Sequence, residues 1–258
     1  MCKIYSIASM KGGVTKTTVS LNLATALSLM GKKVLVIDLD PQGNTTLFAS
    51  TVPSKIANTV YPMLCAALNE ETANPSDYIM PCGSIDIIPS NNKLTAFERN
   101  QGHEIGAECA LQTAIEPLKE LYEIIIIDTP PSLGVLTANA IIASDGIIIP
   151  VTPELFSAVG LMMLTKTIQK VQKHFNPEVQ IEGVLMSMCD VHTNLFKEIS
   201  EIVDETYGQT VRIFNTIIPR STKVGTANLR RQSVLLYDEK SKPSLAYKNF
   251  AKELLNNG

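Results

Sequence analysis

A glycine-rich stretch after a short apolar segment constrains this sequence most strongly. The stretch is Lys11-Gly12-Gly13-Val14-Thr15-Lys16-Thr17-Thr18, and it follows the apolar run Ile4–Ala8. Beyond it, residues 19–30 carry apolar side chains at steps of four and three, the period of a helix. The order strand, glycine turn, helix predicts a phosphate-binding loop. Small residues let backbone N–H groups surround an anion at the positive end of a helix.

One residue of this loop departs from the standard Walker A pattern. Thr15 stands directly before Lys16, where that pattern has glycine. A β-branched residue is poorly suited to a positive φ angle. Two alternatives follow for Thr15: an αR-like backbone or a strained loop.

Acidic residues follow two further apolar strands. Val34–Ile37 leads into Asp38-Leu39-Asp40-Pro41-Gln42-Gly43-Asn44, and Glu123–Asp128 leads into Thr129-Pro130-Pro131. The carboxyl ends of parallel strands share one edge of a sheet, which carries the ligand in open α/β folds. Asp38 and Asp40 lie two residues apart, so we expect them to share a face of the strand. The sequence predicts that Asp128 holds water on Mg²⁺.

The loop motif assigns its own polar side chains to a nucleotide. Lys16 is expected to reach the β- and γ-phosphates, and the Thr17 hydroxyl is expected to bind Mg²⁺. Thr18 would contact the α-phosphate. The sequence therefore predicts Mg-ATP at this edge of the sheet.

Strand and helix patterns alternate along most of the chain. This alternation predicts a right-handed, doubly wound, mostly parallel α/β sheet with helices on both faces, and one domain over residues 1–258. Strands are expected at Cys2–Ser9, Val34–Ile37, Ile85–Pro89, Glu123–Asp128, Gly146–Val151, Val179–Met188 and Ile213–Ile218. Helices are expected at Thr17–Met30, Thr59–Leu68, Leu94–Arg99, Glu104–Leu121, Gly134–Ala143, Ser157–Phe175, Asn194–Tyr207 and Ser244–Leu255.

Composition narrows the class of protein. The five cysteines are scattered without C-x-x-C spacing, which favours reduced thiols over a disulfide framework or a zinc site. The loop begins at residue 11, so we expect no signal peptide, and no uncharged apolar run approaches the roughly 20 residues that span a bilayer. A cytoplasmic protein is therefore expected.

Positive charge gathers near the end of the chain. Residues 208–258 carry nine basic and three acidic side chains, a net charge of +6, against 13 basic and 22 acidic in the remainder, a net charge of −9. Such asymmetry suggests one basic surface on an acidic body. Scattered, solvated side chains are the alternative.

The KGGVTKTT loop, the DLDPQGN segment and the DTPP segment together resemble the ParA/MinD group of deviant Walker A ATPases. The resemblance covers the whole chain and is closest to the short ParA/Soj-like partition ATPases. It implies a slow, partner-stimulated ATPase that dimerises around ATP, binds DNA without sequence preference on the nucleoid, and segregates plasmid or chromosomal DNA with a ParB-like centromere-binding protein. No stable membrane association is implied.

The resemblance also implies roles for individual residues. Lys11 would reach the partner's phosphates in a nucleotide-sandwich dimer, Asp40 would orient the attacking water, and Asp38 would belong to the Mg²⁺ shell. Gln42–Asn44 and Asp128–Pro131 would be switch segments. The adenine would pack near Met188, Asp190, Ile218, Pro219 and Arg220, and the DNA contacts would come from Arg220, Lys223, Arg230 and Arg231.

Two other functions remain open from the sequence. A MinD-like membrane-surface ATPase needs a basic amphipathic tail, whereas we expect Ser244–Leu255 to be a helix packed on the core. A nitrogenase-reductase-like iron–sulfur protein needs cluster cysteines, and neither Cys109 nor Cys189 lies in the motifs of that family.

Overall fold

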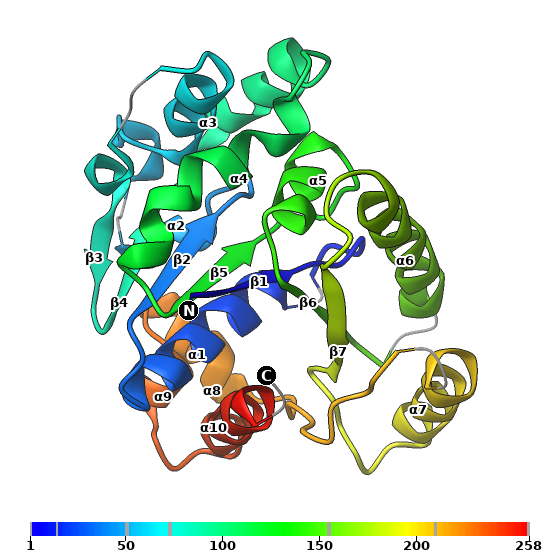
Figure 1. Cartoon of the computed structure of the whole chain (residues 1–258). Helices are drawn as coiled ribbons and strands as arrows, with labels where there is room; N and C mark the ends of the chain where they lie inside the picture. Colours follow the sequence, from blue (N-terminus) through cyan, green and yellow to red (C-terminus); the bar gives the residue numbers. More distant parts are fainter. Residues whose placement is uncertain are drawn as a thin grey trace.

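A mostly parallel β-sheet forms the centre of the protein (Figure 1). The computed structural model describes residues 2–13, 15–49, 52–71, 74–153, 156–208 and 211–256. Within them the strand order is β3-β4-β2-β5-β1-β6-β7, and only the edge pair β3–β4 is antiparallel. The strands are β1 (Lys3–Ile7), β2 (Val34–Asp38), β3 (Met80–Cys82), β4 (Ile85–Ile88), β5 (Ile124–Asp128), β6 (Gly146–Val151) and β7 (Gln180–Met186).

The central strands are buried on both faces. In β5, Ile124 and Ile126 belong to the core on one side of the sheet, and Ile125 and Ile127 to the core on the other. Successive side chains of a strand point to opposite faces, so a continuous run of isoleucines serves two helical layers. The apolar run predicted as the strongest strand therefore lies at the middle of the sheet.

Helices cover both faces of the sheet, which confirms the predicted α/β fold. Figure 1 shows α1, α8, α9 and α10 together on one side and α3, α4 and α5 on the other. None of the described helices is long and apolar enough to cross a bilayer. The helices are α1 (Lys16–Leu29), α2 (Thr46–Ala49), α3 (Val60–Leu68), α4 (Ala110–Ile115), α5 (Val135–Ile142), α6 (Phe156–His174), α7 (Asn194–Tyr207), α8 (Thr222–Leu229), α9 (Val234–Tyr237) and α10 (Lys242–Leu255).

Several predicted elements are wrong between residues 80 and 121. The chain forms the short edge strand β3, which was not predicted. The predicted helix Glu104–Leu121 is divided into η5 (Ala107–Cys109), α4 and η6 (Glu116–Glu120), because Gly106 has a φ of 87° and Pro117 begins a new turn. Instead of a regular helix at Leu94–Arg99, the chain forms η3 (Asn92–Leu94) and a π-helical turn, η4 (Phe97–Gln101).

The segment after α7 also differs from the prediction. Ile213–Ile218 is not a strand; it contacts the sheet through isolated bridges from Ile213 to Val184 and from Pro219 to Cys189. Helices α8 and α9 follow it and were not predicted. This segment therefore places a loop and two short helices beside the end of β7.

The last helix is packed on the core as predicted. Tyr247, Phe250 and Ala251 of α10 are fully buried, and Phe250 meets Phe214 edge to face at 4.9 Å between ring centroids. These side chains share one core with α1 and the strands. The aromatic residues of this helix therefore stabilise the fold.

Candidate functional site

The phosphate-binding loop lies between β1 and α1, at the carboxyl edge of the sheet. Lys16 is the first residue of α1, and its side chain is largely buried. Its ammonium group donates to the carbonyl of Lys11 at 3.3 Å, and burial lowers the pKa of Lys16 while Asp128 and Asp40 act to raise it. The side chain of Lys11 is half-buried. Val14, also predicted here, lies outside the described residues.

Thr15 adopts the strained alternative. Its φ of 66° and ψ of 18° lie in the left-handed region, the conformation that glycine would supply without strain. The Thr15 hydroxyl is 2.7 Å from the hydroxyl of Ser187, which is fully buried directly after β7. This hydrogen bond joins the loop after β1 to the segment after β7, two strands away in the sheet, and a glycine could not make it.

Asp128 sits at the centre of a set of hydroxyl groups. Its carboxylate accepts from Thr17 at 2.7 Å, from Thr45 at 2.7 Å and from Ser20 at 3.0 Å. The side chain is fully buried, so desolvation raises its pKa, while these hydroxyls and the charge of Lys16 act to lower it. A hydroxyl and carboxylate oxygens at this separation are the hard donors that Mg²⁺ takes beside its waters. Thr17 and Asp128 therefore fit the predicted metal site.

Asp38 has a separate set of partners. Its carboxylate accepts from the backbone of Thr46 at 2.8 Å, from the Thr46 hydroxyl at 2.7 Å and from the backbone of Asp40 at 3.2 Å. Because β2 and β5 are paired with Asp38 opposite Asp128, the two carboxylates face the same buried edge. Desolvation and then the charge of Asp128 raise the pKa of Asp38 to about 8.

Asp40 points elsewhere than the strand pattern suggests. Strand β2 ends at Asp38, so the expected shared face does not extend to Asp40. Instead, Asp40 accepts from the backbone of Gln42 at 2.9 Å and lines a cavity with it. Asp38 is thus held inside the protein, whereas Asp40 borders the space where a ligand would lie.

Sequence reasoning missed the hydroxyl partners of the two aspartates. Thr45 and Thr46 directly follow the predicted switch segment, and Ser20 lies one helical turn after Lys16. Their position next to the motifs could have predicted this role, because a buried carboxylate needs hydrogen-bond donors. We call Asp38 and Asp128 with Thr17, Ser20, Thr45 and Thr46 the carboxylate cage.

A cavity of about 670 Å³ opens in front of the loop. It brings together the phosphate-binding loop, the segment after β2 and the end of α8. Such a volume is in the range of small-molecule sites. Its lining residues are Gly12, Gly13, Thr15, Lys16, Thr17, Thr18, Asp40, Gln42, Asn44, Leu47, Phe48, Pro131, Met188, Asn228, Leu229 and Arg231.

A second hollow adjoins the first along Thr15, Thr18 and Met188. It measures about 490 Å³ and contains Met188, Ile218, Pro219 and Arg220, four of the five residues predicted near adenine. Its lining is more apolar than polar, as a purine requires. Asp190 instead borders a third hollow of about 370 Å³, together with Met188 and Arg220.

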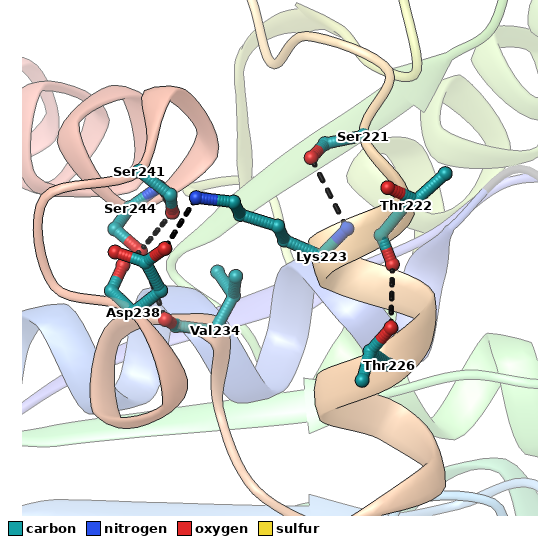
Figure 2. Close-up of polar contacts among 8 residues, drawn as sticks. All are labelled: Ser221, Thr222, Lys223, Thr226, Val234, Asp238, Ser241 and Ser244. Carbon is teal, nitrogen blue, oxygen red and sulfur yellow. Dashed lines mark hydrogen bonds and ion pairs between the residues drawn. The ribbon is translucent and has the colours of Figure 1, made fainter.

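The four basic residues predicted to contact DNA have different surroundings. Figure 2 shows Lys223 of α8 in an ion pair with Asp238, whose backbone carbonyl accepts from Ser244 at 2.7 Å. The Arg230 guanidinium lies 5.1 Å from the ring centroid of Tyr237. Arg220 is exposed beside the apolar hollow, and Arg231 lines the cavity of the phosphate-binding loop. Of these four residues, Arg231 is the one that lines the cavity in front of the loop, Arg220 lines the neighbouring hollows, and Lys223 and Arg230 line none of these three spaces.

Comparison with known proteins identifies the family. A family model described as "AAA domain" matches residues 2–181. The sporulation initiation inhibitor protein Soj of Bacillus subtilis is 38% identical over 260 residues, covering 100% of both chains. The chromosome partitioning protein ParA of Caulobacter vibrioides is 34% identical, covering 98% of this chain and 94% of ParA.

A solved structure shows a similar fold with nucleotide. Cobyrinic acid a,c-diamide synthase from Mycobacterium smegmatis, with bound ATP analogue and magnesium, has a TM-score of 0.86 and 30% identity, covering 100% of this chain and 96% of that one. Soj and ParA are each similar to this chain over nearly its whole length. The chain therefore belongs to the ParA/Soj family of partition ATPases.

Proposed function

We propose that this protein binds Mg-ATP in the cavity at the carboxyl edge of its sheet and hydrolyses it as a partition ATPase. The observation that carries the proposal is the position of Lys16 and Thr17 on the cavity wall, with the buried Asp128 carboxylate directly behind Thr17. Support comes from the similar structure that contains an ATP analogue and magnesium. Phosphate release by the purified protein, with and without Mg²⁺, tests it: no Mg-dependent hydrolysis would contradict the assignment.

The lining residues divide the work of binding. Backbone N–H groups of Gly12 and Gly13 and the Lys16 ammonium would hold the phosphates, because they place positive charge at a helix start. Thr17 and Asp128 would hold Mg²⁺, which supplies charge that neutralises the phosphates. The hollow around Met188, Ile218 and Pro219 would take the purine, with Arg220 and, from the neighbouring hollow, Asp190 at its border.

Asp40 is the proposed positioning group for the attacking water. It borders the cavity and is fixed by the backbone of Gln42, whereas Asp38 is enclosed by Thr46 and would act on the Mg²⁺ shell from behind. A single carboxylate is a weak base, so turnover by the isolated protein is expected to be slow. An Asp40→Ala variant that still binds ATP but hydrolyses it at the wild-type rate would remove this role.

Hydrolysis is proposed to need two copies of the chain, with Lys11 acting on the partner's nucleotide. Mixing two inactive variants tests this directly. In a mixed dimer of Lys11→Ala and Asp40→Ala, the Lys11→Ala chain keeps its own Asp40 and receives Lys11 from its partner. If Lys11 acts in trans, mixing restores activity to part of the wild-type level. If Lys11 acts within its own chain, the mixture stays inactive.

The ATP-bound dimer is proposed to bind DNA without sequence preference on the nucleoid, and a ParB-like partner is proposed to stimulate its turnover. Soj and ParA are relatives named for sporulation control and chromosome partitioning. All four predicted residues are exposed, and Arg220, Lys223 and Arg230 lie outside the cavity of the phosphate-binding loop. Contacts to DNA phosphates make affinity fall steeply with salt. Charge reversal at Lys223 and Arg230, which line neither the cavity nor the purine hollow, is expected to abolish DNA retention. Retained DNA binding by that variant would contradict this surface.

A further inference from the structure

Strained backbone conformations concentrate around the nucleotide cavity. Among the described residues, four that are not glycine have a positive φ, and three of them line this one cavity: Thr15 at 66°, Met188 at 54° and Arg231 at 54°. The fourth is Glu70, after α3. A left-handed conformation crowds the Cβ atom against the backbone, and such conformations cluster at functional sites. Of the other two, Thr15 belongs to the phosphate-binding loop and Met188 to the purine hollow, which leaves Arg231 without an assigned role.

Arg231 occupies a position that usually favours glycine. It follows the end of α8, where its N–H donates to the carbonyl of Asn228 at 2.9 Å and the N–H of Gln232 donates to Ala227 at 3.1 Å. This pattern closes a helix and needs a left-handed residue just past the end. An arginine here accepts a backbone cost that glycine would avoid, and local geometry alone gives no reason for it.

The backbone beside Arg231 is fixed to the helix that begins at the phosphate-binding loop. Asn22 of α1 accepts from the Ser233 hydroxyl at 2.7 Å and from the backbone of Val234 at 2.8 Å. On the other side, the amide of Asn228 approaches the Thr18 hydroxyl at 3.5 Å. Arg231 therefore projects from a segment held at both ends against α1.

The surroundings of the Arg231 guanidinium differ from those of the charged groups of Lys223 and Arg230. Lys223 is paired with Asp238, and Arg230 lies over Tyr237. Within the described part of the chain, no carboxylate lies at ion-pair distance from Arg231, whose side chain is exposed and shares the cavity wall with Gly12, Gly13 and Lys16. A guanidinium offers several N–H donors in a plane that matches phosphate oxygens.

We propose that Arg231 binds the phosphates of the nucleotide within its own chain, and does not contact DNA. This inference rests on the proposed ATP site. It replaces the DNA-binding role predicted from the sequence with a role in holding ATP or ADP from the part of the cavity wall that follows α8.

Nucleotide affinity of an Arg231→Gly variant tests the proposal, since glycine keeps the helix end and relieves its strain. Competition against a fluorescent ATP analogue would be measured for ATP, ADP and adenosine. ATP and ADP are expected to bind about 10- to 100-fold more weakly, the effect of losing a charge-assisted hydrogen bond. Adenosine, which lacks phosphate, is expected to bind as it does to wild type. The ATP affinity of an Arg231→Lys variant should lie between those of wild type and Arg231→Gly.

Controls separate this role from a general change of charge or fold. Lys240→Ala removes the same charge from a nearby exposed loop and should leave ATP affinity within about twofold, because solvent screens it. If wild type itself binds no ATP, the proposed function fails. If wild type binds ATP and Arg231→Gly binds it equally well, this inference alone is overturned. Loss of DNA binding by Arg231→Gly at saturating ATP, with ATP affinity intact, would restore the sequence-based role.

Discussion

The carboxylate cage and the basic surface of Arg220, Lys223 and Arg230 show two opposite ways of placing charge. In the cage, Asp38 and Asp128 are fully buried, and each carboxylate is surrounded by hydroxyl or backbone donors. On the surface, Lys223 and Arg230 are solvated and have one principal neighbour each. Buried charges cost much and are kept only with partners, whereas exposed ones cost little. Substitutions in the cage region should therefore have large effects, and those on the surface small ones.

The largest effect is expected from Lys16→Ala. This change removes the positive charge that we propose acts on the transferring phosphoryl group, so hydrolysis should fall about 100-fold or more. Phosphate release at saturating Mg-ATP measures it. Lys32→Ala is the matched control, because Lys32 does not line the cavity and forms an ion pair of 2.9 Å with Glu123. Equal rates in wild type and Lys16→Ala would show that the cavity is not the catalytic site.

The next largest effect is expected in the pH dependence of the free energy of unfolding, measured on metal-free protein. Because the pKa of Asp38 is raised to about 8, its protonated form is favoured in the folded state. The stability that protonated Asp38 contributes to the fold is fully present below the ordinary aspartate pKa and is lost as pH rises through about 8. The free energy of unfolding of wild type, relative to Asp38→Asn, should therefore fall between pH 4 and 8, by more than about 1 kcal/mol.

Chemical denaturation of both proteins across this range measures the difference. Surface carboxylates that gain stability with rising pH are common to both, so they cancel. A difference that stays constant, or that grows with pH, would contradict the buried carboxylate pair.

A smaller effect is expected at the hydrogen bond between Thr15 and Ser187. Thr15→Val keeps the β-branched shape but leaves the buried Ser187 hydroxyl without this partner, so it should destabilise the fold by about 1–3 kcal/mol. Thr15→Ser keeps the hydroxyl and should lie within about 1 kcal/mol of wild type. Thermal unfolding of both variants checks the pair. Equal stability of Thr15→Val and Thr15→Ser would show that the hydroxyl contact contributes nothing.

The smallest effect is expected on the basic surface. Lys223→Ala breaks the ion pair with Asp238, which is exposed to solvent, so Tm should change by no more than about 2 °C. DNA retention in the presence of ATP is the property that should weaken. A large loss of Tm would contradict this, because it would mean that the exposed Lys223–Asp238 ion pair in Figure 2 stabilises the fold.

The same contrast explains what the sequence could predict. The long isoleucine run of β5 and the loop before α1 are local signals, and both lie where the pattern placed them. Strand β3 has three residues, including Pro81, and is too short for any period. The role of Thr45, which donates to Asp128 of β5, depends on β2 and β5 being neighbours, which sequence spacing does not show. Thr46 donates to Asp38, only eight residues earlier in the chain.

The region of α8 and α9 was harder to predict for a related reason. Both helices are short, and the first N–H of α9, from Val234, donates to Asn22, which lies more than 200 residues earlier. From the sequence, charge is the signal that predicts a DNA contact for Arg231. Its left-handed backbone and its place on the cavity wall are visible only in the structure.

Calorimetric titration of ATP into wild type and Asp128→Asn, each with and without Mg²⁺, tests the central claim most directly. If the cage and the loop form a Mg-ATP site, wild type binds one ATP per chain and Mg²⁺ tightens that binding. The neutral Asp128→Asn side chain should lose most of the Mg²⁺ effect. If wild type binds no ATP, or if Mg²⁺ leaves the ATP affinity of both proteins unchanged, the cage and the loop do not form a Mg-ATP site.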